Sequence, residues 1–309
     1  VHIGNYGITD EESESNSIKI AGLICRNFSQ HHSRKQADAS LTDYFIEQNI
    51  VAICEIDTRA LVRHIRNKGA MNGIISSETL DVDVLKRTLS DVPSMEGLEL
   101  SSTVSTKVPY FFGNPDAKFK VAVLDEGVKT NTLRCLSDRN CYVKVFPYNT
   151  SFEEMSAWEP DGFLVSNGPG DPAVMPNVVQ IVKDIIAHDK PVFGICLGHQ
   201  LISEACGIST FKMFNGHRGI NHPVKNMVTG HSEVTSQNHG FSIGLKDVDK
   251  SDVVEITHVN LNDHSVEGIR VKNKKAFSVQ YHPESAPGPD DSRYLFDDFV
   301  DLVKGDLVW

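Results

Sequence analysis

The sequence predicts an α/β protein with a C-terminal domain over 119–309, built on a mostly parallel central sheet, and a smaller N-terminal mixed α/β domain over 1–107. The first observation is that strand-like and helix-like runs alternate after residue 119, a pattern typical of a parallel sheet covered by helices on both faces. The second is the length of 309 residues, which suffices for two domains. The third is the composition of 108–118, which is rich in Pro, Gly and Asn, as in a linker.

The N-terminal domain is expected to contain two strands and two helices. Its strands are predicted at 18–25 and 50–56, and its first helix at 40–48, where apolar residues recur at helical spacing. The second helix is predicted to begin near Thr58 and to end at Gly69, because glycine is common just after the last turn of a helix.

The C-terminal domain is expected to begin with four strand–helix pairs. The predicted strands are 119–125, 142–146, 162–166 and 191–195, and the predicted helices are 130–138, 152–158, 178–188 and 197–206. Shorter strands and one amphipathic helix are expected to complete this domain. The strands are 233–236, 253–257, 268–271 and 276–280, and the helix is 292–304.

Composition and charge exclude several classes of protein. The chain is 40% hydrophobic and 23% charged, as expected for a globular protein, and its formal net charge is −11. Nucleic acids and anionic membranes are themselves negatively charged, so we expect neither as a partner. No apolar run approaches the roughly 18 residues that span a bilayer.

The start of the chain shows no secretory signal, because no charged stretch precedes an apolar segment. We therefore expect a cytoplasmic protein. The six cysteines form no CxxC pair and no dense framework, so they are expected to be mostly reduced, buried thiols. The first residue is Val rather than Met, and we expect a fragment or a processed form.

The most informative segment is a predicted strand that ends in Gly194-Ile-Cys196-Leu-Gly198, directly before a predicted helix. This is the pattern of a nucleophile elbow with Cys in the nucleophile position. The N-terminal end of a helix favours a thiolate, and the Leu197 amide would point to where an oxyanion forms. The alternative is a buried structural cysteine in a strand–helix turn.

His282 and Glu284 are the candidates for the base and the residue that orients it. They stand at the end of a predicted strand, where a carboxylate two residues from a histidine can lie on the same side of the chain. Such a carboxylate holds the imidazole in the tautomer that accepts a proton from the thiol. A surface His–Glu pair is the alternative. A metal site is not expected, because no second cluster has ligand spacing.

A second glycine loop, Ser166-Asn-Gly168-Pro-Gly170-Asp-Pro172, follows another predicted strand. Glycines allow backbone amides to approach a ligand closely. A phosphate cradle is disfavoured, because no Lys follows the glycines and two prolines remove donors. A second oxyanion donor is the better interpretation, because the carboxyl ends of neighbouring parallel strands meet in one crevice. A plain turn remains the alternative.

Together these motifs resemble the class I, or triad, glutamine amidotransferase domain over residues 119–309. The resemblance implies that Cys196, His282 and Glu284 form the catalytic triad and that the amides of Gly168 and Leu197 bind the oxyanion. It also implies a set of residues that contact L-glutamine. These are Gly168, Gly170, Leu197, Gln200, Asn238, Gly240 and Phe241. Without the resemblance, the segment from Asn238 to Gly240 is also typical of a hairpin turn.

Other segments are similar to one branch of that family, the small subunits of carbamoyl-phosphate synthetase. The similar segments are 2–7, 56–61, 63–66, 69–73, 127–134, 216–219, 221–223, 236–241 and 287–289. The resemblance implies a heterodimer or larger complex in which ammonia passes to a large subunit that uses bicarbonate, ATP and Mg²⁺. This chain itself is expected to bind no cofactor. The product would serve pyrimidine or arginine synthesis.

The departure from that family lies before residue 2, where its members usually carry a further segment with a serine that contacts glutamine. We therefore expect one of two things: the sequence is truncated at its start, or its glutamine pocket lacks one wall. The alternatives are an amidotransferase of the GMP, CTP or anthranilate type, a stand-alone γ-glutamyl hydrolase, and a non-catalytic regulatory partner.

Overall fold

The computed structural model describes residues 5–15 and 17–307 and divides the chain into two compact units, 1–94 and 95–309. None of the helices in these described ranges is long and apolar enough to cross a membrane. The two units are described separately below.

The first unit combines a two-stranded parallel sheet with short helices. Its elements are the 3-10 helix Asp10–Glu12, β1 (Gly22–Ile24), α1 (Leu41–Glu47), β2 (Val51–Ile53), α2 (Thr58–Lys68) and α3 (Val82–Ser90). The Ser40 side chain caps α1 by accepting from the Asp43 amide, and α2 ends at Gly69 with φ 89°. The two predicted helices are thus confirmed, the strands predicted at 18–25 and 50–56 are shorter than expected at three residues each, and α3 is additional. Of the opening segment 2–7, residues 2–4 lie outside the described residues.

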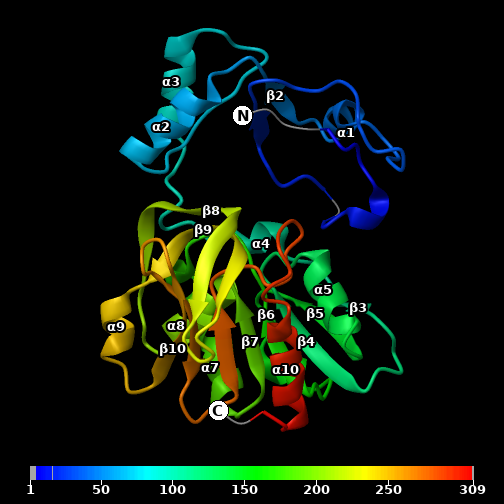
Figure 1. The fold of residues 1–309 in the computed structure, drawn as a ribbon, viewed down its shortest axis with the longest axis vertical. Coiled ribbons are helices and arrows are strands. Elements are labelled where there is room, and N and C mark those ends of the chain that lie inside the picture. The colour runs from blue at the N-terminus through cyan, green and yellow to red at the C-terminus, as the bar shows by residue number, and fades with distance from the viewer. Residues whose placement is uncertain (1–4, 16, 308–309) are drawn as a thin grey trace. The chain divides into compact units, whose positions relative to one another are not determined.

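The second unit is built on a ten-stranded sheet in the order β3-β5-β4-β6-β7-β12-β11-β10-β8-β9. The five strands from β5 to β12 in this order are parallel, and the remaining pairs are antiparallel. Figure 1 shows β3 and β5 toward one edge of this sheet and β8 and β9 toward the other. The strand bounds are β3 Tyr110–Phe112, β4 Phe119–Asp125, β5 Cys141–Pro147, β6 Gly162–Val165, β7 Val192–Ile195, β8 Thr210–Asn226, β9 Ser232–Ile243, β10 Val254–Asn260, β11 Val266–Val271 and β12 Ala276–Val279.

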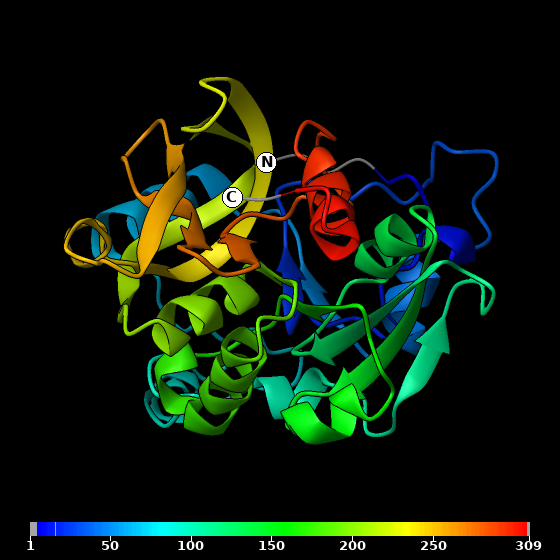
Figure 2. The ribbon, with the colours of Figure 1, turned by 90° about the horizontal axis from the view of Figure 1, so that it is seen from below.

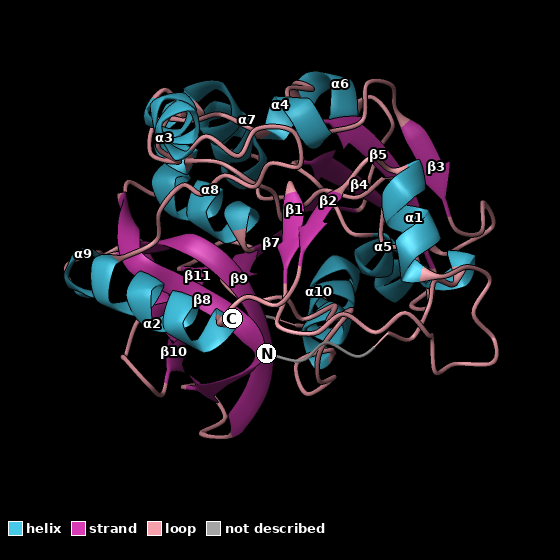
Figure 3. Ribbon diagram, turned by 90° about the horizontal axis from the view of Figure 1, so that it is seen from above, coloured by secondary structure: helices cyan, strands magenta, loops and turns pink. Residues whose placement is uncertain are grey.

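Helices cover both faces of the parallel part, as the alternating pattern predicts. On one face α6, α7 and α8 bury apolar side chains such as Val182 and Leu201, and on the other face α5 and α10 bury Leu136 and Phe296. Figures 2 and 3 show this separation of the helices around the sheet. The bounds are α4 Ser101–Val104, α5 Thr130–Ser137, α6 Phe152–Ser156, a 3-10 helix Pro172–Val174, α7 Pro176–Ala187, α8 Leu197–Ala205, α9 Leu245–Asp249 and α10 Tyr294–Lys304.

The segment expected as a linker, 108–118, contains an edge strand. In it β3 pairs antiparallel with β5, and Phe111 stacks on Tyr142 with ring centroids 5.2 Å apart. The preceding residues also belong to the second unit, which begins at Met95 rather than near 107. The Thr106 amide, for example, donates to Asp125 Oδ2 at 2.7 Å. The Pro, Gly and Asn residues mark the turns on either side of a three-residue strand.

The topology brings three loops to one edge of the sheet. Strands β6, β7 and β12 are parallel neighbours, so their carboxyl ends lie side by side. The loop after β6 begins at Ser166, β7 is followed by Cys196, and β12 leads into Gln280 and His282. The sequence places all of its candidate catalytic residues in these loops.

Candidate active site

Cys196 occupies a strained turn between β7 and α8. Its φ of 54° and ψ of −102° are costly for a residue with a side chain, and such strain is typical of a nucleophile elbow. The Cys196 amide donates to the Val279 carbonyl oxygen at 2.9 Å, which fixes the turn to β12. The thiol is 4% exposed. The backbone therefore holds the sulfur in one place at the N-terminal end of α8.

The two glycines of the elbow are required by close packing. A Cβ on Gly198 would lie 2.1 Å from the Val165 carbonyl oxygen, and one on Gly194 would lie 2.7 Å from the Gly198 carbonyl oxygen. Both neighbours are backbone atoms, which cannot rotate away. The pattern G-x-C-x-G thus reflects the contact of the elbow with β6 as well as the turn itself.

Replacing Gly198 by Ala is expected to lower the free energy of unfolding by about 3 kcal/mol, at the upper end for overpacking a rigid site. Urea unfolding followed by circular dichroism would measure this change. The matched control is Gly73→Ala, because a Cβ there meets nothing within 4 Å. Equal stability of the two variants would contradict the close contact between α8 and β6.

His282 and Glu284 lie beside the thiol. The Cys196 sulfur is near enough to the His282 ring to raise its pKa, and His282 Nδ1 lies 2.8 Å from Glu284 Oε1. The His282 side chain is 6% exposed and that of Glu284 is fully buried. The structure therefore brings the three predicted catalytic residues together.

The charges in this group keep Glu284 ionised and His282 protonated. Burial alone lowers the pKa of His282, but the Glu284 carboxylate and the Cys196 sulfur more than offset this and raise that pKa to about 9. Burial alone raises the pKa of Glu284, whereas His282 and then Lys129 lower it to about 2. An imidazolium–carboxylate pair is therefore the ground state near neutral pH, and this proton is available to a leaving group.

Two further residues support this group, and neither was predicted from the sequence. Lys129 Nζ, at the start of α5, lies 2.9 Å from Glu284 Oε1 and donates to the Ser285 carbonyl oxygen at 3.0 Å. Gln280 Nε2 lies 3.7 Å from Cys196 Sγ. Lys129 stands in a segment that resembles the family, but a contact across 155 positions leaves no local sequence signal.

The second glycine loop packs against the elbow. The Gly198 amide donates to the Ser166 carbonyl oxygen at 3.1 Å, and a Cβ on Gly168 would lie 2.1 Å from the Glu126 carbonyl oxygen. Among the described residues, the amides of Gly168 and Leu197 donate no hydrogen bond to the protein. Neither predicted oxyanion donor is thus engaged by another described residue.

The residues predicted to contact glutamine lie on β9, on the glycine loop after β6 and at the start of α8. Asn238, Gly240 and Phe241 lie within β9, and the Asn238 carbonyl oxygen is 4.0 Å from Cys196 Sγ. The hairpin turn that was the alternative for this segment is not found. Gly170 lies on the glycine loop, where a Cβ would meet the Leu98 carbonyl oxygen at 2.9 Å.

Gln200 lies on α8 and is buried, and its side-chain amide is directed into the protein. Its Nε2 donates to the Phe241 carbonyl oxygen and to Gln280 Oε1, both at 3.0 Å. Gln200 therefore links β9 to the residue that contacts the Cys196 sulfur. This geometry is that of a residue that positions the walls of the site.

The other cysteines have a different environment. Burial raises the pKa of Cys135 and of Cys206 to about 11 and that of Cys141 to about 12, so these thiols stay protonated. All six cysteines are free. The Cys196 sulfur, in contrast, raises the pKa of a neighbouring histidine, His282.

Two family profiles match the sequence. The profile of "Glutamine amidotransferase class-I" matches residues 122–302, which include the loops after β6, β7 and β12. The profile of "Carbamoyl-phosphate synthase small chain, CPSase domain" matches residues 1–75.

Curated relatives match nearly the whole chain. The carbamoyl phosphate synthase small chain of Chlorobaculum tepidum is 45% identical over 98% of this chain and 82% of its own length. Those of Thermotoga maritima and Corynebacterium diphtheriae are 43% and 46% identical, again over 98% of this chain, and are covered over 84% and 82% of their lengths.

A solved structure supports the fold. A crystal structure described as that of a GMP synthase subunit from Thermoplasma acidophilum matches with a TM-score of 0.53 at 22% identity. The match covers 61% of this chain and 95% of that one. At this identity the likeness concerns the α/β architecture alone.

Proposed function

The chain belongs to the family of carbamoyl phosphate synthase small chains, and from this membership we propose that it hydrolyses L-glutamine at Cys196 and passes the ammonia to a large chain. The observation that carries the proposal is the contact of one strained, buried cysteine with the His282–Glu284 pair. A thiol, a proton carrier and an orienting carboxylate are the groups that acyl transfer from an amide requires.

The first half of the reaction forms a thioester. The Cys196 thiolate attacks the side-chain carbonyl carbon of glutamine, and the carbonyl oxygen becomes an oxyanion on the amides of Gly168 and Leu197. Losing one such donor typically costs about 2.7–4 kcal/mol of transition-state stabilisation. His282, which holds the proton that came from the thiol, gives it to the departing nitrogen, so ammonia leaves and a glutamyl thioester remains.

The second half restores the enzyme. His282 is now neutral and accepts a proton from water, whose oxygen attacks the thioester carbon. The carbon–sulfur bond breaks, glutamate leaves, and the sulfur again faces a protonated His282. Glu284 keeps its charge throughout and stabilises the imidazolium each time it forms.

The fate of the ammonia involves a second protein. We infer that a large chain combines it with bicarbonate and ATP, with Mg²⁺ bound to that large chain, and that this chain binds no nucleotide. A heterodimer or larger complex in the cytoplasm, serving pyrimidine or arginine synthesis, is the setting that the family suggests.

The test is to measure glutamate formed from glutamine by the purified chain, alone and with the large chain of a close relative. We expect glutamine hydrolysis, and carbamoyl phosphate formation once ATP, bicarbonate and the large chain are added. A parallel assay with ammonium chloride in place of glutamine checks that the large chain is active. Carbamoyl phosphate made from ammonium but not from glutamine, with no glutamate released, would contradict the proposal.

A further inference from the structure

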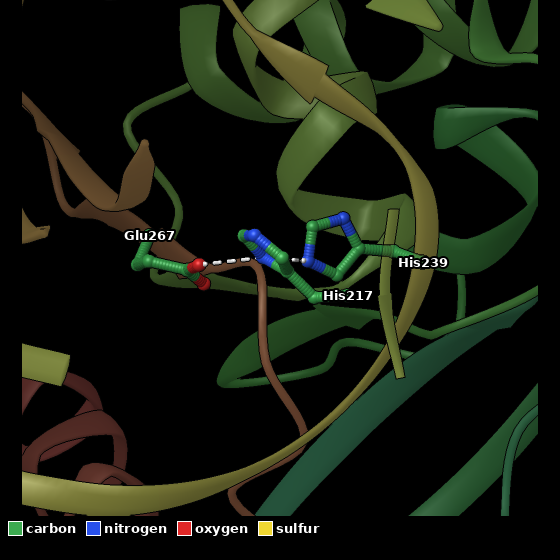
Figure 4. Close-up of side chains that lie close together, drawn as sticks. All are labelled: His217, His239 and Glu267. Atoms are coloured by element: carbon green, nitrogen blue, oxygen red, sulfur yellow. Dashed lines mark hydrogen bonds and ion pairs between the residues drawn. The ribbon is translucent and has the colours of Figure 1, made fainter. Parts of the chain in front are cut away.

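Three polar side chains from three strands meet in the antiparallel part of the sheet. His217 comes from β8, His239 from β9 and Glu267 from β11, and Figure 4 shows the two rings and the carboxylate converging. All three residues are buried, at 7%, 5% and 0% exposure. None of them was a candidate site residue in the sequence, and the proposed mechanism uses none of them.

The distances among their polar atoms match a small coordination shell. His217 Nδ1 lies 3.1 Å from His239 Nε2 and 3.2 Å from Glu267 Oε1. Ligands about 2.0–2.1 Å from a tetrahedral Zn²⁺ lie about 3.3 Å from one another. The three ligand atoms all lie within 4.8 Å of one another, so small side-chain rotations would bring all three within coordination distance of one ion.

The outer hydrogen bonds orient both rings toward a common point. His239 Nδ1 lies 2.8 Å from the Phe241 carbonyl oxygen and must donate to it, which leaves the Nε2 lone pair facing His217. His217 Nε2 lies 2.9 Å from Asp263 Oδ2. Carbonyl and carboxylate partners of this kind usually fix metal-ligating histidines.

Unused acceptors surround the same point. Glu267 Oε2 is buried and has no hydrogen-bond partner among the described residues, and Oε1 accepts from Asn260 Nδ2 at 2.9 Å. Gln237 Oε1 lies 3.0 Å from His239 Nε2, which it cannot satisfy as a donor, and His217 Nδ1 is the ring nitrogen near enough to donate to that lone pair. Buried acceptors without donors are costly, and a cation between them removes that cost.

We propose that His217, His239 and Glu267 form a binding site for one divalent transition-metal ion of the Zn²⁺ type. Two imidazoles and one carboxylate are a donor set that such ions prefer. Asp263, which is 45% exposed and bonded to His217, marks the side that faces solvent. A bound ion would join β8, β9 and β11 next to Asn238 and Gly240. The proposal does not depend on the proposed function.

The test is zinc binding in a Cys196→Ser background, which removes the catalytic thiol as a competing ligand. The chain is equilibrated with Zn²⁺, freed of unbound ion by gel filtration, and its metal content is measured by mass spectrometry. We expect the Cys196→Ser protein to hold one more zinc ion per chain than the Cys196→Ser protein that also carries Glu267→Gln. The Kd of that variant should be at least about a hundredfold weaker, because losing even an outer partner of a metal ligand costs 10–100-fold. His231→Gln is the matched control, since His231 is exposed and lies outside the cluster.

Cobalt gives a second readout that does not depend on how well one variant folds. Co²⁺ in the intact site should show the visible absorption of a tetrahedral nitrogen and oxygen site, without the charge-transfer band of a thiolate. His217→Gln provides a second variant, and circular dichroism checks the fold of each. Zinc content unchanged by both variants, or no zinc above background in the parent, would overturn the proposal and leave a buried cluster held by hydrogen bonds alone.

Discussion

Replacing Cys196 by Ser is expected to lower kcat for glutamine hydrolysis by on the order of 10⁴-fold or more, the scale at which triad hydrolases respond to loss of the nucleophile. A serine hydroxyl at this position does not ionise in contact with His282, so the attacking anion is lost. Glutamate release measures the change. Cys54→Ser is the matched control, because Cys54 is exposed and lies in the first unit.

The same variant separates hydrolysis from synthesis. With the large chain present, Cys196→Ser should lose glutamine-dependent formation of carbamoyl phosphate and keep formation from ammonium, because the fold that the large chain binds is unchanged. Glutamine hydrolysis that survives at the parent rate would refute the assignment of the nucleophile.

Glu284→Gln is expected to lower kcat by on the order of 10³–10⁴-fold, as in other triads that lose the orienting carboxylate. The amide cannot stabilise the imidazolium, and it can hold the ring in the wrong tautomer. The pKa of His282 should fall from about 9, because burial then acts without its largest opposing charge. Titration of isotope-labelled histidine by NMR measures the fall. Glu204→Gln, on α8 outside the site, should leave it unchanged.

The Glu284 variant should also change how stability depends on pH. The pKa of Glu284 falls from 4.5 to about 2 on folding, so its contribution is present above pH 4.5 and is lost as the pH falls toward 2. The pKa of His282 rises from 6.5 to about 9, so its contribution is present below pH 6.5 and is lost as the pH rises through 9. Both contributions to the free energy of unfolding are present in full between pH 4.5 and 6.5. Urea unfolding in that window should show the largest loss for Glu284→Gln, and an equal loss at pH 3 and pH 6 would contradict the ion pair.

Local patterns were sufficient for the parallel half of the second unit. Strand β4 was predicted with its observed bounds, and α8 to within one residue, because apolar runs of the right length are bounded there by turn residues. The elbow could be located for the same reason. Its glycines, Gly194 and Gly198, are required by contacts made within one strand–turn–helix unit and by the neighbouring strand.

The antiparallel half could not be predicted in the same way. Strand β8 spans 17 residues, but its register shifts between Lys212 and His217 and again between Gly219 and His222, which removes any steady alternation. Strand β9 continues to Ile243 through polar residues that are buried. Their hydrogen-bond partners include residues that lie far away in the sequence. The support of Glu284 by Lys129 has the same origin, since only the folded chain brings those two residues together.

The hydrogen bonds that bind the elbow to its neighbours have a mechanical consequence. The Gly198 amide is held by Ser166, the Cys196 amide by Val279, and the His282 amide by the Ser236 carbonyl oxygen at 2.9 Å. Backbone that carries the sulfur, the ring and the loop of Gly168 thus forms a single rigid frame, in which the reacting groups can shift only by side-chain rotation. The entropy cost of aligning these groups is therefore incurred when the chain folds, and not when glutamine binds.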